Sequence, residues 1–474
     1  MLEPGPGLPP DLADRFPEGD LIAHGARHCL RALAAFRPYP GQIFCTETAA
    51  RLLDAGLAEE FSLQAVLARH VKGAAARDHE EVRCDASGRR AVQSLHALAA
   101  ALNRALTKAS LGPVFEIESR AIPILAQADE AGVPVDRAGI AELKKSFQRE
   151  AATISAEIGT SLAAPSLDLE NSAQLERALV RAGLPVRSTA DSALLKFPDH
   201  PVVRVLFLFR KSVQLAQACQ DVLDLLGANG RLAGPQDRLL DLLARLPQVL
   251  QAPPGRALVI ADAEPLPVWI AAAVSGQPAL LAAIQQGNNP HALTAAQVLE
   301  RQPVTPEEQA VGRVVNQTLI HGHSADTLRG ELIQSGLAST HDCQGIRKQF
   351  FRHYPEIARW HEDCQKRARA KAPEIRTPLG RRRRIPATAT TWQRFSSIVS
   401  ATLRGGADDV IKKTLVTARL PESALICGAS PTAAFIECDA ADASLVEGAW
   451  CEGLRKTFEE LYSPEKVGVH GFEP

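Results

Sequence analysis

The stretch ALVIAD, residues 257–262, is an apolar run that ends in an acid, and it is the clearest single strand in the chain. Two more strand-like runs lie near the C-terminus in SALICGASPTAAFIECD, residues 423–439, on either side of a Gly, Ser and Pro turn. Residues 264–370 are rich in helical patterns. We predict that the three runs form one antiparallel sheet, with Asp262 beside the Ser430–Thr432 turn at its centre.

The sequence before this sheet divides into a small α/β unit and a set of long helices. Residues 21–110 alternate short apolar runs with helical patterns, and Gly112-Pro113 marks a boundary. In residues 138–159, AGIAELKKSFQREAATISAEIG, apolar residues recur mostly at three- and four-residue steps, which predicts one face of a long amphipathic helix. A further helix is predicted near residues 201–226. Residues 1–20 are rich in Pro and acids, and we expect a disordered tail there.

The overall composition is that of an ordinary globular chain without a charge excess. Its 474 residues contain 53 Lys and Arg against 54 Asp and Glu, so no net positive field indicates a nucleic-acid partner. Nine scattered Cys without a CxxC pair favour free thiols in a reducing compartment. Neither a secretory signal nor a membrane-length apolar run is present. We therefore expect an intracellular protein, in the cytoplasm or nucleoid or in an organelle matrix, with no membrane partner.

Six stretches, in the right order, resemble segments of the family A DNA polymerases of the bacterial DNA polymerase I type. IPILAQADEAGVPVD (122–136) resembles the opening thumb helix of that family, and NSAQLERALVRAGLPV (171–186) resembles its Asn-Ser-x-x-Gln-Leu segment. NNPHALTAAQVLE (288–300) resembles the Asp-x-His-x-x-Thr-Ala entry to the fingers. QFFRHYPEIARWHE (349–362) resembles the family's Tyr-Pro helix, and RTPLGRRRRIP (376–386) resembles its arginine hairpin. GGADDVIKKTL (405–415) resembles its palm helix.

The N-terminal part resembles a shortened 3′–5′ exonuclease domain. LIAHGARHCLRAL (21–33) and IFCTETAARLLDAG (43–56) resemble two motifs of that domain, but the opening strand with its Asp-x-Glu pair has no counterpart. Proofreading requires two metal ions held by four carboxylates. Cys29 and Cys45 stand at two aspartates of these motifs, and Arg90 falls near a third. The resemblance therefore implies a degenerate exonuclease-like domain without activity.

The resemblance implies an α+β right-hand polymerase fold of thumb, palm and fingers. A reduced α/β domain of the exonuclease-like (ribonuclease H-like) type is expected to precede it. The expected divisions are a tail (1–20), the exonuclease-like domain (21–112), the thumb with the start of the palm (113–250), a palm strand (251–280), the fingers (281–390) and the rest of the palm (391–474).

Nucleotidyl transfer in this family uses two metal ions about 4 Å apart, held between two palm aspartates. Asp262 stands at the first of them. Pro267 stands at the glutamate that excludes ribonucleotides, and Trp269 at the following arginine. The turn that carries the second aspartate falls on Ser430, Pro431, Thr432 and Ala433. Because none of these four is a carboxylate, we expect no catalytic residue beyond the remnant Asp262, and no bound metal.

The nucleotide-binding helix of the fingers is changed in a similar way. Gln309 stands at the family's arginine, Arg313 at its lysine, Gln317 at its phenylalanine and His321 at its tyrosine. Asn316 and Gly322 are retained. Arg313 could still bind a phosphate, but the platform on which a base would stack is lost. The alternative is an ordinary helix with one exposed arginine, and the sequence favours that alternative.

The segments that contact DNA in the family are also altered. A primer–template gripping segment is replaced by GPQDRLLDLLARLPQVLQAPPGR (234–256), which predicts a short helix, and Ser400 and Arg404 stand at an asparagine and a glutamine of the palm helix. The hairpin is the one concentrated basic feature, and it is either a solvated turn or a nucleic-acid contact. Its arginines are Arg376, Arg381, Arg382, Arg383 and Arg384.

A cluster of metal-ligand residue types occurs at His321, His323, His341 and Cys343, but its spacing matches no common zinc site. We expect loop or capping histidines there.

These observations favour a catalytically inactive polymerase-like protein that acts as a scaffold or accessory subunit of a larger assembly, with a protein partner and with DNA or RNA as a further partner. One alternative is a divergent but active DNA polymerase in replication or repair, which would require Mg²⁺. Another is a non-catalytic DNA- or RNA-binding module. In the favoured reading, no cofactor is needed and the chain is a pseudoenzyme. Trp269, Pro267 and His321 are expected to make the old cleft suited to a protein partner.

Overall fold

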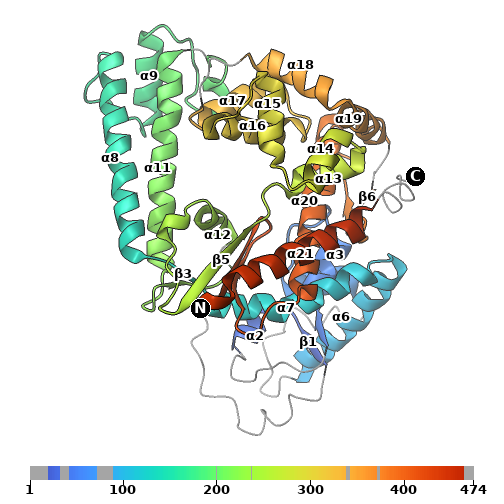
Figure 1. Cartoon of the computed structure of the whole chain (residues 1–474). Coiled ribbons are helices and arrows are strands. Elements are labelled where there is room, and N and C mark those ends of the chain that lie inside the picture. The colour runs from blue at the N-terminus through green and yellow to red at the C-terminus, as the bar shows by residue number, and fades with distance from the viewer. Residues whose placement is uncertain are drawn as a thin grey trace.

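A computed structural model describes residues 20–32, 42–71, 89–198, 200–235, 237–337, 342–370 and 374–463 (Figure 1). The described residues leave out nearly all of the predicted disordered tail and the whole of His341. They also leave out the side chain of Arg90. No helix in the described ranges is long and apolar enough to cross a bilayer. The eight described cysteines are all free, as the sequence predicted for them.

The three runs that decide the fold form one antiparallel sheet. Strands β5 (Arg256–Asp262), β8 (Leu425–Ala429) and β9 (Ala433–Asp439) are ordered β5-β9-β8. Asp262 pairs with Ala433, so it lies beside the Ser430–Thr432 turn, as predicted. The strand at the centre is β9, whose residues 433–438 are all buried, and Asp262 ends an edge strand. The prediction of adjacency is confirmed, while the central place belongs to β9.

A pair of long helices rises from one end of this sheet. Helices α8 (Arg137–Ser161) and α11 (Pro201–Leu225) pack along each other, with the short helices α9 (Ser172–Arg181) and α10 (Asp191–Leu194) near the tip (Figure 1). At the base, β3 (Val133–Pro134) pairs with β4 (Arg231–Leu232). The amphipathic pattern places Ile140 and Ile158 of α8 in the interior, as predicted.

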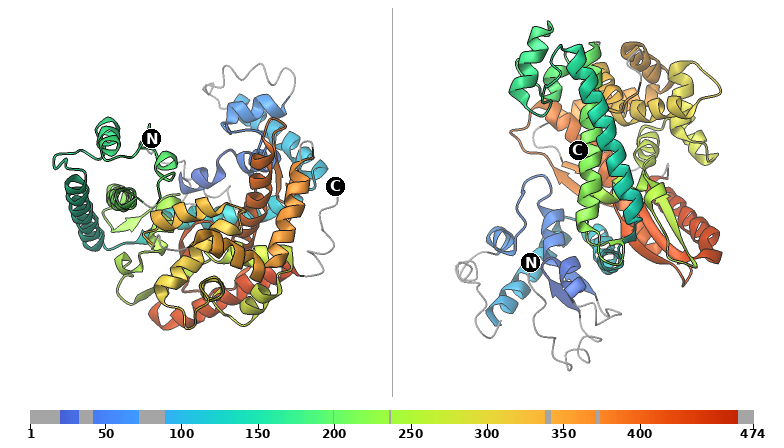
Figure 2. Two further views of the ribbon diagram at one scale, coloured as in Figure 1. Left: turned by 90° about the horizontal axis from the view of Figure 1, so that it is seen from above. Right: turned by 90° about the vertical axis from the view of Figure 1, so that its left-hand side faces the viewer.

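A compact group of helices follows β5 on the other side of the sheet (Figures 1 and 2). It contains α13 (Leu266–Ser275), α14 (Pro278–Gln285), α15 (Pro290–Leu299), α16 (Pro306–Leu319), α17 (Ala325–Gln334), α18 (Cys343–His353) and α19 (Pro355–Ala368). A capping box of Thr305 and Glu308 fixes the start of α16. Gly312 allows α16 to lie against α15, because a Cβ there would meet the His291 carbonyl oxygen at 2.2 Å.

The chain then returns to the sheet through the predicted basic hairpin. Strands β6 (Glu374–Arg376) and β7 (Arg382–Arg384) pair antiparallel, and the long helix α20 (Thr391–Thr417) leads into β8. Helix α21 (Ala443–Tyr462) packs against β5, β9 and α20. Gly406 of α20 leaves room for the Tyr462 hydroxyl, which a Cβ would meet at 2.0 Å.

The N-terminal unit is a small α/β arrangement. Parallel strands β1 (Leu21–Ala23) and β2 (Ile43–Cys45) are accompanied by α2 (Ala26–Ala32), α3 (Thr46–Leu53), α4 (Leu63–His70) and α6 (Arg89–Lys108). Helix α7 (Gly112–Ala131) begins at the predicted boundary and packs against α2, α3, α20 and β8. The loop after α3 reaches the hairpin, where the Arg384 N–H donates to the Ala55 carbonyl at 3.0 Å.

We expect Gly56→Ala to detach the N-terminal unit from the hairpin. Gly56 has φ +84°, and an added Cβ would lie 1.9 Å from the Arg384 carbonyl oxygen. The left-handed backbone costs an alanine about 1–2 kcal/mol, and the overlap should cost about 1–3 kcal/mol more. Gly183→Ala is the matched control, because Gly183 has φ +89° with no atom within 4 Å of its Cβ position.

The measurement is urea unfolding combined with hydrogen exchange at the Arg384 amide. Gly56→Ala should lose more stability than Gly183→Ala and should accelerate exchange at that amide. Equal losses without faster exchange would show that this contact does not hold the unit in place.

Candidate nucleic-acid interface

The retained aspartate lies at the exposed end of β5. The Asp262 side chain accepts a hydrogen bond from the Glu264 N–H at 2.8 Å, and the Ala263 N–H donates to the Thr432 carbonyl at 2.7 Å. Asp262 is therefore an exposed carboxylate at a strand end that accepts a backbone hydrogen bond.

The turn at the place of the second aspartate is bound internally by Asp241. The Ser430 and Thr432 hydroxyls both donate to Asp241 Oδ1, at 2.5 and 2.6 Å. Asp241 belongs to α12 (Asp237–Ala244), the short helix predicted for residues 234–256. Ser430 Oγ also accepts from the Ala433 N–H at 3.1 Å, while Pro431 has no donor to offer. The Ser430 and Thr432 hydroxyls thus tie this turn to α12.

The residues around this turn do not fit a pair of metal ions. Within the described ranges, no group of three or more His, Cys, Asp or Glu side chains could hold a metal ion. Asp241 Oδ1 accepts hydrogen bonds from two hydroxyls, and Asp241 lies on α12, which packs against β8 and β9. Sequence reasoning missed Asp241, because an acid within LLDLL carries no signal of a contact nearly 200 residues away.

Glu264, which the sequence did not single out, joins β5 to the helices that follow. Its carboxylate lies 2.9 Å from His291 Nε2 and 3.7 Å from Arg313 Nε, and it accepts from the Gln317 amide at 2.5 Å. Burial alone would raise the pKa of Glu264, but His291, Arg313 and Gln317 hold it below its usual value. The charge of Arg313 is therefore partly neutralised by a carboxylate from its own chain.

Asn316 is fully buried and serves the interior of this helix group. Its amide donates to His291 Nδ1 at 3.0 Å and accepts from the Thr294 hydroxyl at 3.1 Å. Gly322 has φ +77° and packs against Phe395, whose ring would lie 2.5 Å from an added Cβ. Of the four nucleotide-binding remnants, the structure brings Arg313 and Asn316 together around Glu264 and His291. It places His321 and Gly322 next to α20.

His321 is an uncharged group at neutral pH. Burial, the nearby Arg404 and the neighbouring His323 and His361 lower its pKa to about 4. Its ring lies 6.4 Å from that of His323, which in turn packs edge-on against Trp392. An uncharged imidazole offers no cation to a triphosphate.

We expect His321 to make stability depend on acid pH. Its folded pKa lies below the usual 6.5, so its contribution is complete above pH 6.5 and is lost as the pH falls toward about 4. The loss should reach about 3 kcal/mol at most. His321→Gln should remove this part of the pH dependence, measured as urea stability between pH 4 and 7. An NMR titration midpoint near 6.5 for the His321 ring would contradict the expectation.

The arginine hairpin is mostly an internal structure, which corrects the expectation of a free basic turn. Arg382 and Arg384 both donate to the Leu53 carbonyl, at 2.9 and 2.5 Å. Arg381 is ion-paired to Glu118, Asp408 and Asp409 at 2.6, 3.2 and 2.7 Å. Arg376 pairs with Glu374 at 2.7 Å and donates to the Ala109 carbonyl. Of the four consecutive arginines, Arg383 is exposed and the other three are partly buried.

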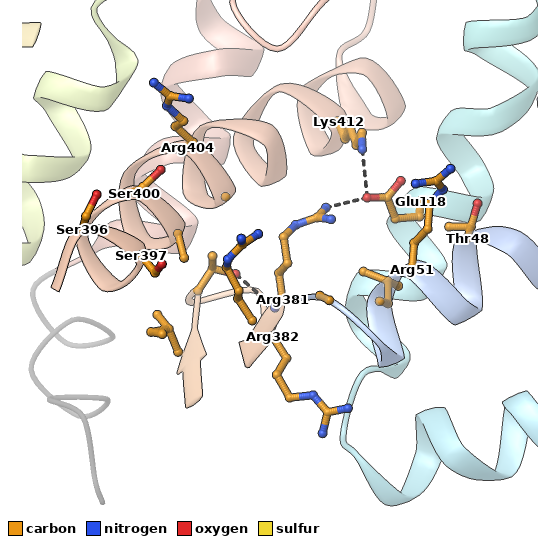
Figure 3. A pocket seen from close by; sticks show the side chains of 17 residues that line it. Thr48, Arg51, Glu118, Arg381, Arg382, Ser396, Ser397, Ser400, Arg404 and Lys412 are labelled. Atoms are coloured by element: carbon orange, nitrogen blue, oxygen red, sulfur yellow. Dashed lines mark hydrogen bonds and ion pairs between the residues drawn. The ribbon is translucent and has the colours of Figure 1, made fainter. Parts of the chain in front are cut away.

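A cavity of about 640 Å³ lies where this hairpin, α20, α7 and α3 meet (Figure 3). Its lining contains six cations and one carboxylate, with hydroxyl groups from α3 and α20. The charged residues are Arg51, Arg381, Arg382, Arg383, Arg404, Lys412 and Glu118. Lys412 and Arg381 converge on Glu118, as the dashed lines of Figure 3 show. The lining of this cavity is therefore strongly basic.

Trp269 does not point into an open cleft, which corrects the expectation of an apolar docking surface. Its ring packs edge-on against Phe458 of α21 at 5.8 Å. Pro267 and His321 are both only partly exposed. Substitution of Trp269 would disturb packing between α13 and α21, so it cannot report on an interface.

In the N-terminal unit, the two cysteines at the exonuclease positions make local contacts. The Ala26 N–H donates to Cys45 Sγ at 3.5 Å, and Cys29 Sγ donates to the His24 carbonyl at 3.6 Å. Burial and the neighbouring Cys45 raise the pKa of Cys29. On α2, Arg27 donates to both carboxylate oxygens of Asp129 in α7, which ties this unit to α7.

Comparison with known proteins agrees with this architecture. Residues 241–422 match the family DNA polymerase family A. The chain is 25% identical over 325 residues to DNA polymerase I of Aquifex aeolicus, covering 63% of this chain and 55% of that protein. It is 26% identical over 306 residues to the thermostable DNA polymerase I of Thermus aquaticus, covering 57% of this chain and 36% of that protein. The chain thus matches about half or less of the length of these relatives.

In structure, the chain is similar to the POL domain of Pol1 from M. smegmatis, solved in complex with a DNA primer-template and dNTP. The TM-score is 0.75 at 19% identity, over 94% of this chain and 85% of that one. This likeness establishes the α+β polymerase fold. Taken with the match of residues 241–422, it shows that the chain is similar to the family A DNA polymerases in fold and, over that range, in sequence.

Proposed function

We propose that this chain is a polymerase-like protein without polymerase activity, which binds nucleic acid and serves as an accessory or scaffold subunit of a larger assembly. The observation that carries the proposal is the turn beside Asp262, where Ser430 and Thr432 donate to Asp241. Two-metal transfer requires a second carboxylate at this turn. An isolated Asp262 cannot hold both ions.

The internal contacts of the fingers residues support the same proposal. Glu264 lies beside Arg313, and Asn316 is used in the interior. A triphosphate would have to compete with Glu264 for Arg313, the cation that stands at the family's lysine. We assign residues 113–250 to the thumb and start of the palm, 251–280 to a palm strand, 281–390 to the fingers and 391–474 to the palm. We assign residues 21–112 to a reduced exonuclease-like domain without proofreading activity.

Nucleic acid is favoured over protein as the ligand of the described surface. The exposed large apolar side chains in the described ranges are few and lie on separate elements, so they suggest no docking patch. They are Leu57, Val92, Val180, Leu225, Trp392 and Leu445. The cavity lined by six cations offers instead the chemistry that recognises phosphate.

The proposal is tested by measuring binding and extension on one sample. A fluorescently labelled primer–template should bind with an affinity that falls steeply with salt, and its primer should keep its length in Mg²⁺ and dNTPs. Failure to bind any nucleic acid would remove the binding half of the proposal, and extension would remove the other half.

A further inference from the structure

Two groups of helices rise from the sheet and touch each other away from it (Figure 1). The first, called the α8–α11 arm, contains α8, α9, α10 and α11. The second is the group from α13 to α19. Helix α17 of the second group packs against α11 of the arm. The chain reaches this contact from both sides of the sheet, so the contact joins the two groups a second time.

Helix α17 has apolar residues on two faces, one for each group. Leu328 and Leu332 lie one turn apart and belong to the core that the α13–α19 group shares with the sheet. Ile333 belongs instead to the core of the α8–α11 arm, together with Leu194 and Phe207, and it is 3% exposed. One residue of α17 thus completes the core of the arm.

A glycine and a hydrogen bond complete this contact. A Cβ added at Gly330 would lie 3.0 and 3.1 Å from the two methyl carbons of Leu195, so the absence of a side chain lets the arm approach α17 closely. Beside it, Lys211 Nζ donates to the Ser335 carbonyl at 2.8 Å, across 124 residues of sequence. The contact therefore combines a buried isoleucine, a fitted glycine and a hydrogen bond to the backbone.

The two groups can separate without losing their own cores. Among the described buried residues of the arm's core, Ile333 is the one that comes from the α13–α19 group. Burial of an isoleucine favours the joined form. Parts of one chain that share a small contact ordinarily move relative to each other. These two facts are typical of a contact that is shut most of the time and opens without unfolding.

We propose that the contact between α11 and α17 is a latch, which holds the α8–α11 arm against the α13–α19 group in the free protein and has to open before the arm can swing. A ligand that binds only after the arm has swung away must supply the free energy of opening, so the latch sets how readily such a ligand is taken up. The latch is a property of the free chain and does not depend on the proposed function.

The test is single-molecule fluorescence energy transfer between dyes at Glu150 of α8 and Lys348 of α18, both exposed and labelled through unnatural amino acids. The parent should show one narrow population, the shut form. Gly330→Leu places a side chain where Leu195 lies, and Ile333→Ala removes the residue that completes the arm's core. Each should add a population with lower transfer. For Ile333→Ala the ratio of open to shut molecules should rise at least about 30-fold, the factor that corresponds to the smaller costs of such a truncation in a core.

Gly448→Leu is the matched control for Gly330→Leu. Gly448 also lies within a helix, α21, but has no atom within 4 Å of its Cβ position. This variant should show the same single population as the parent.

A disulfide distinguishes opening of the latch from unfolding of the arm. Leu195 Cγ lies 3.6 Å from the Gly330 Cβ position, so cysteines at these two positions are within reach of a bond whose Cβ atoms lie about 3.5–4.5 Å apart. In L195C/G330C/I333A, glutathione disulfide should take up both thiol hydrogens and restore the shut population, and dithiothreitol should release it. All samples carry Cys451→Ser, which removes an exposed native thiol.

Three results would overturn the inference. The first is a parent in which the shut form does not predominate. The second is an unchanged single population in both Gly330→Leu and Ile333→Ala. The third is an open population that oxidation of the cysteine variant fails to restore to the shut form, which would show that the arm unfolds when Ile333 is truncated. The proposed function is decided separately, by extension and binding of a primer–template.

Discussion

Arg381→Ala is expected to lower the free energy of unfolding by about 3–5 kcal/mol, the usual cost of removing one partner from a buried ion pair. The guanidinium lies 2.6 Å from Glu118 and 2.7 Å from Asp409, whose side chain is 1% exposed. Of its hydrogen bonds within the described residues, Asp409 would keep the one from Thr377. Glu118 would keep Lys412 at 2.9 Å. The network therefore loses the one residue that links both carboxylates.

The pH dependence of this loss follows from Asp409. Burial already raises the pKa of Asp409 to about 6 in the presence of Arg381. Without the guanidinium the pKa should rise further, so Asp409 can be protonated and uncharged in mildly acidic solution. The destabilisation should then be smaller at pH 5 than at pH 8.

Arg383→Ala is the matched control, since Arg383 is exposed and has no ion-pair partner within the described residues. Its effect should stay within about 0.5 kcal/mol. Urea unfolding of both variants at pH 5 and pH 8 gives the comparison. Similar small losses for Arg381→Ala and Arg383→Ala would show that the hairpin is a solvated turn after all.

The sheet and the long helices could be predicted from the sequence because burial leaves a local pattern. The apolar run that ends at Asp262 and the two runs around the Ser430–Thr432 turn carry their own strand signal. The amphipathic spacing in α8 and the Gly-Pro boundary before α7 are likewise local. These predictions needed no knowledge of distant partners.

The roles of charged residues could not be predicted, since a charge reveals its partner only in three dimensions. Arg381 looks like part of a solvated basic turn, yet its partner Glu118 lies 263 residues earlier in the sequence. Trp269 looks like an exposed replacement in a cleft, yet it packs on Phe458 from the C-terminal helix. Asp241 and Glu264 gave no signal because their hydrogen-bond partners come from other elements.

No nucleotide incorporation is expected with either Mg²⁺ or Mn²⁺. Polymerisation needs two carboxylates to hold both ions and to neutralise the charge that develops on the phosphates. Asp262 is one such group, but the adjacent turn presents Thr432 and Ser430, both bonded to Asp241. Glu264 also lies 3.7 Å from Arg313, so a triphosphate would compete with this carboxylate for the guanidinium.

The most direct measurement is primer extension with protein in excess over a labelled primer–template, at saturating dNTPs and with Mg²⁺ or Mn²⁺, alongside Asp262→Ala and Asp241→Asn variants. The expected result is a primer of unchanged length for the parent and both variants, although the parent binds nucleic acid. Template-directed extension by the parent that disappears in Asp262→Ala would contradict this account.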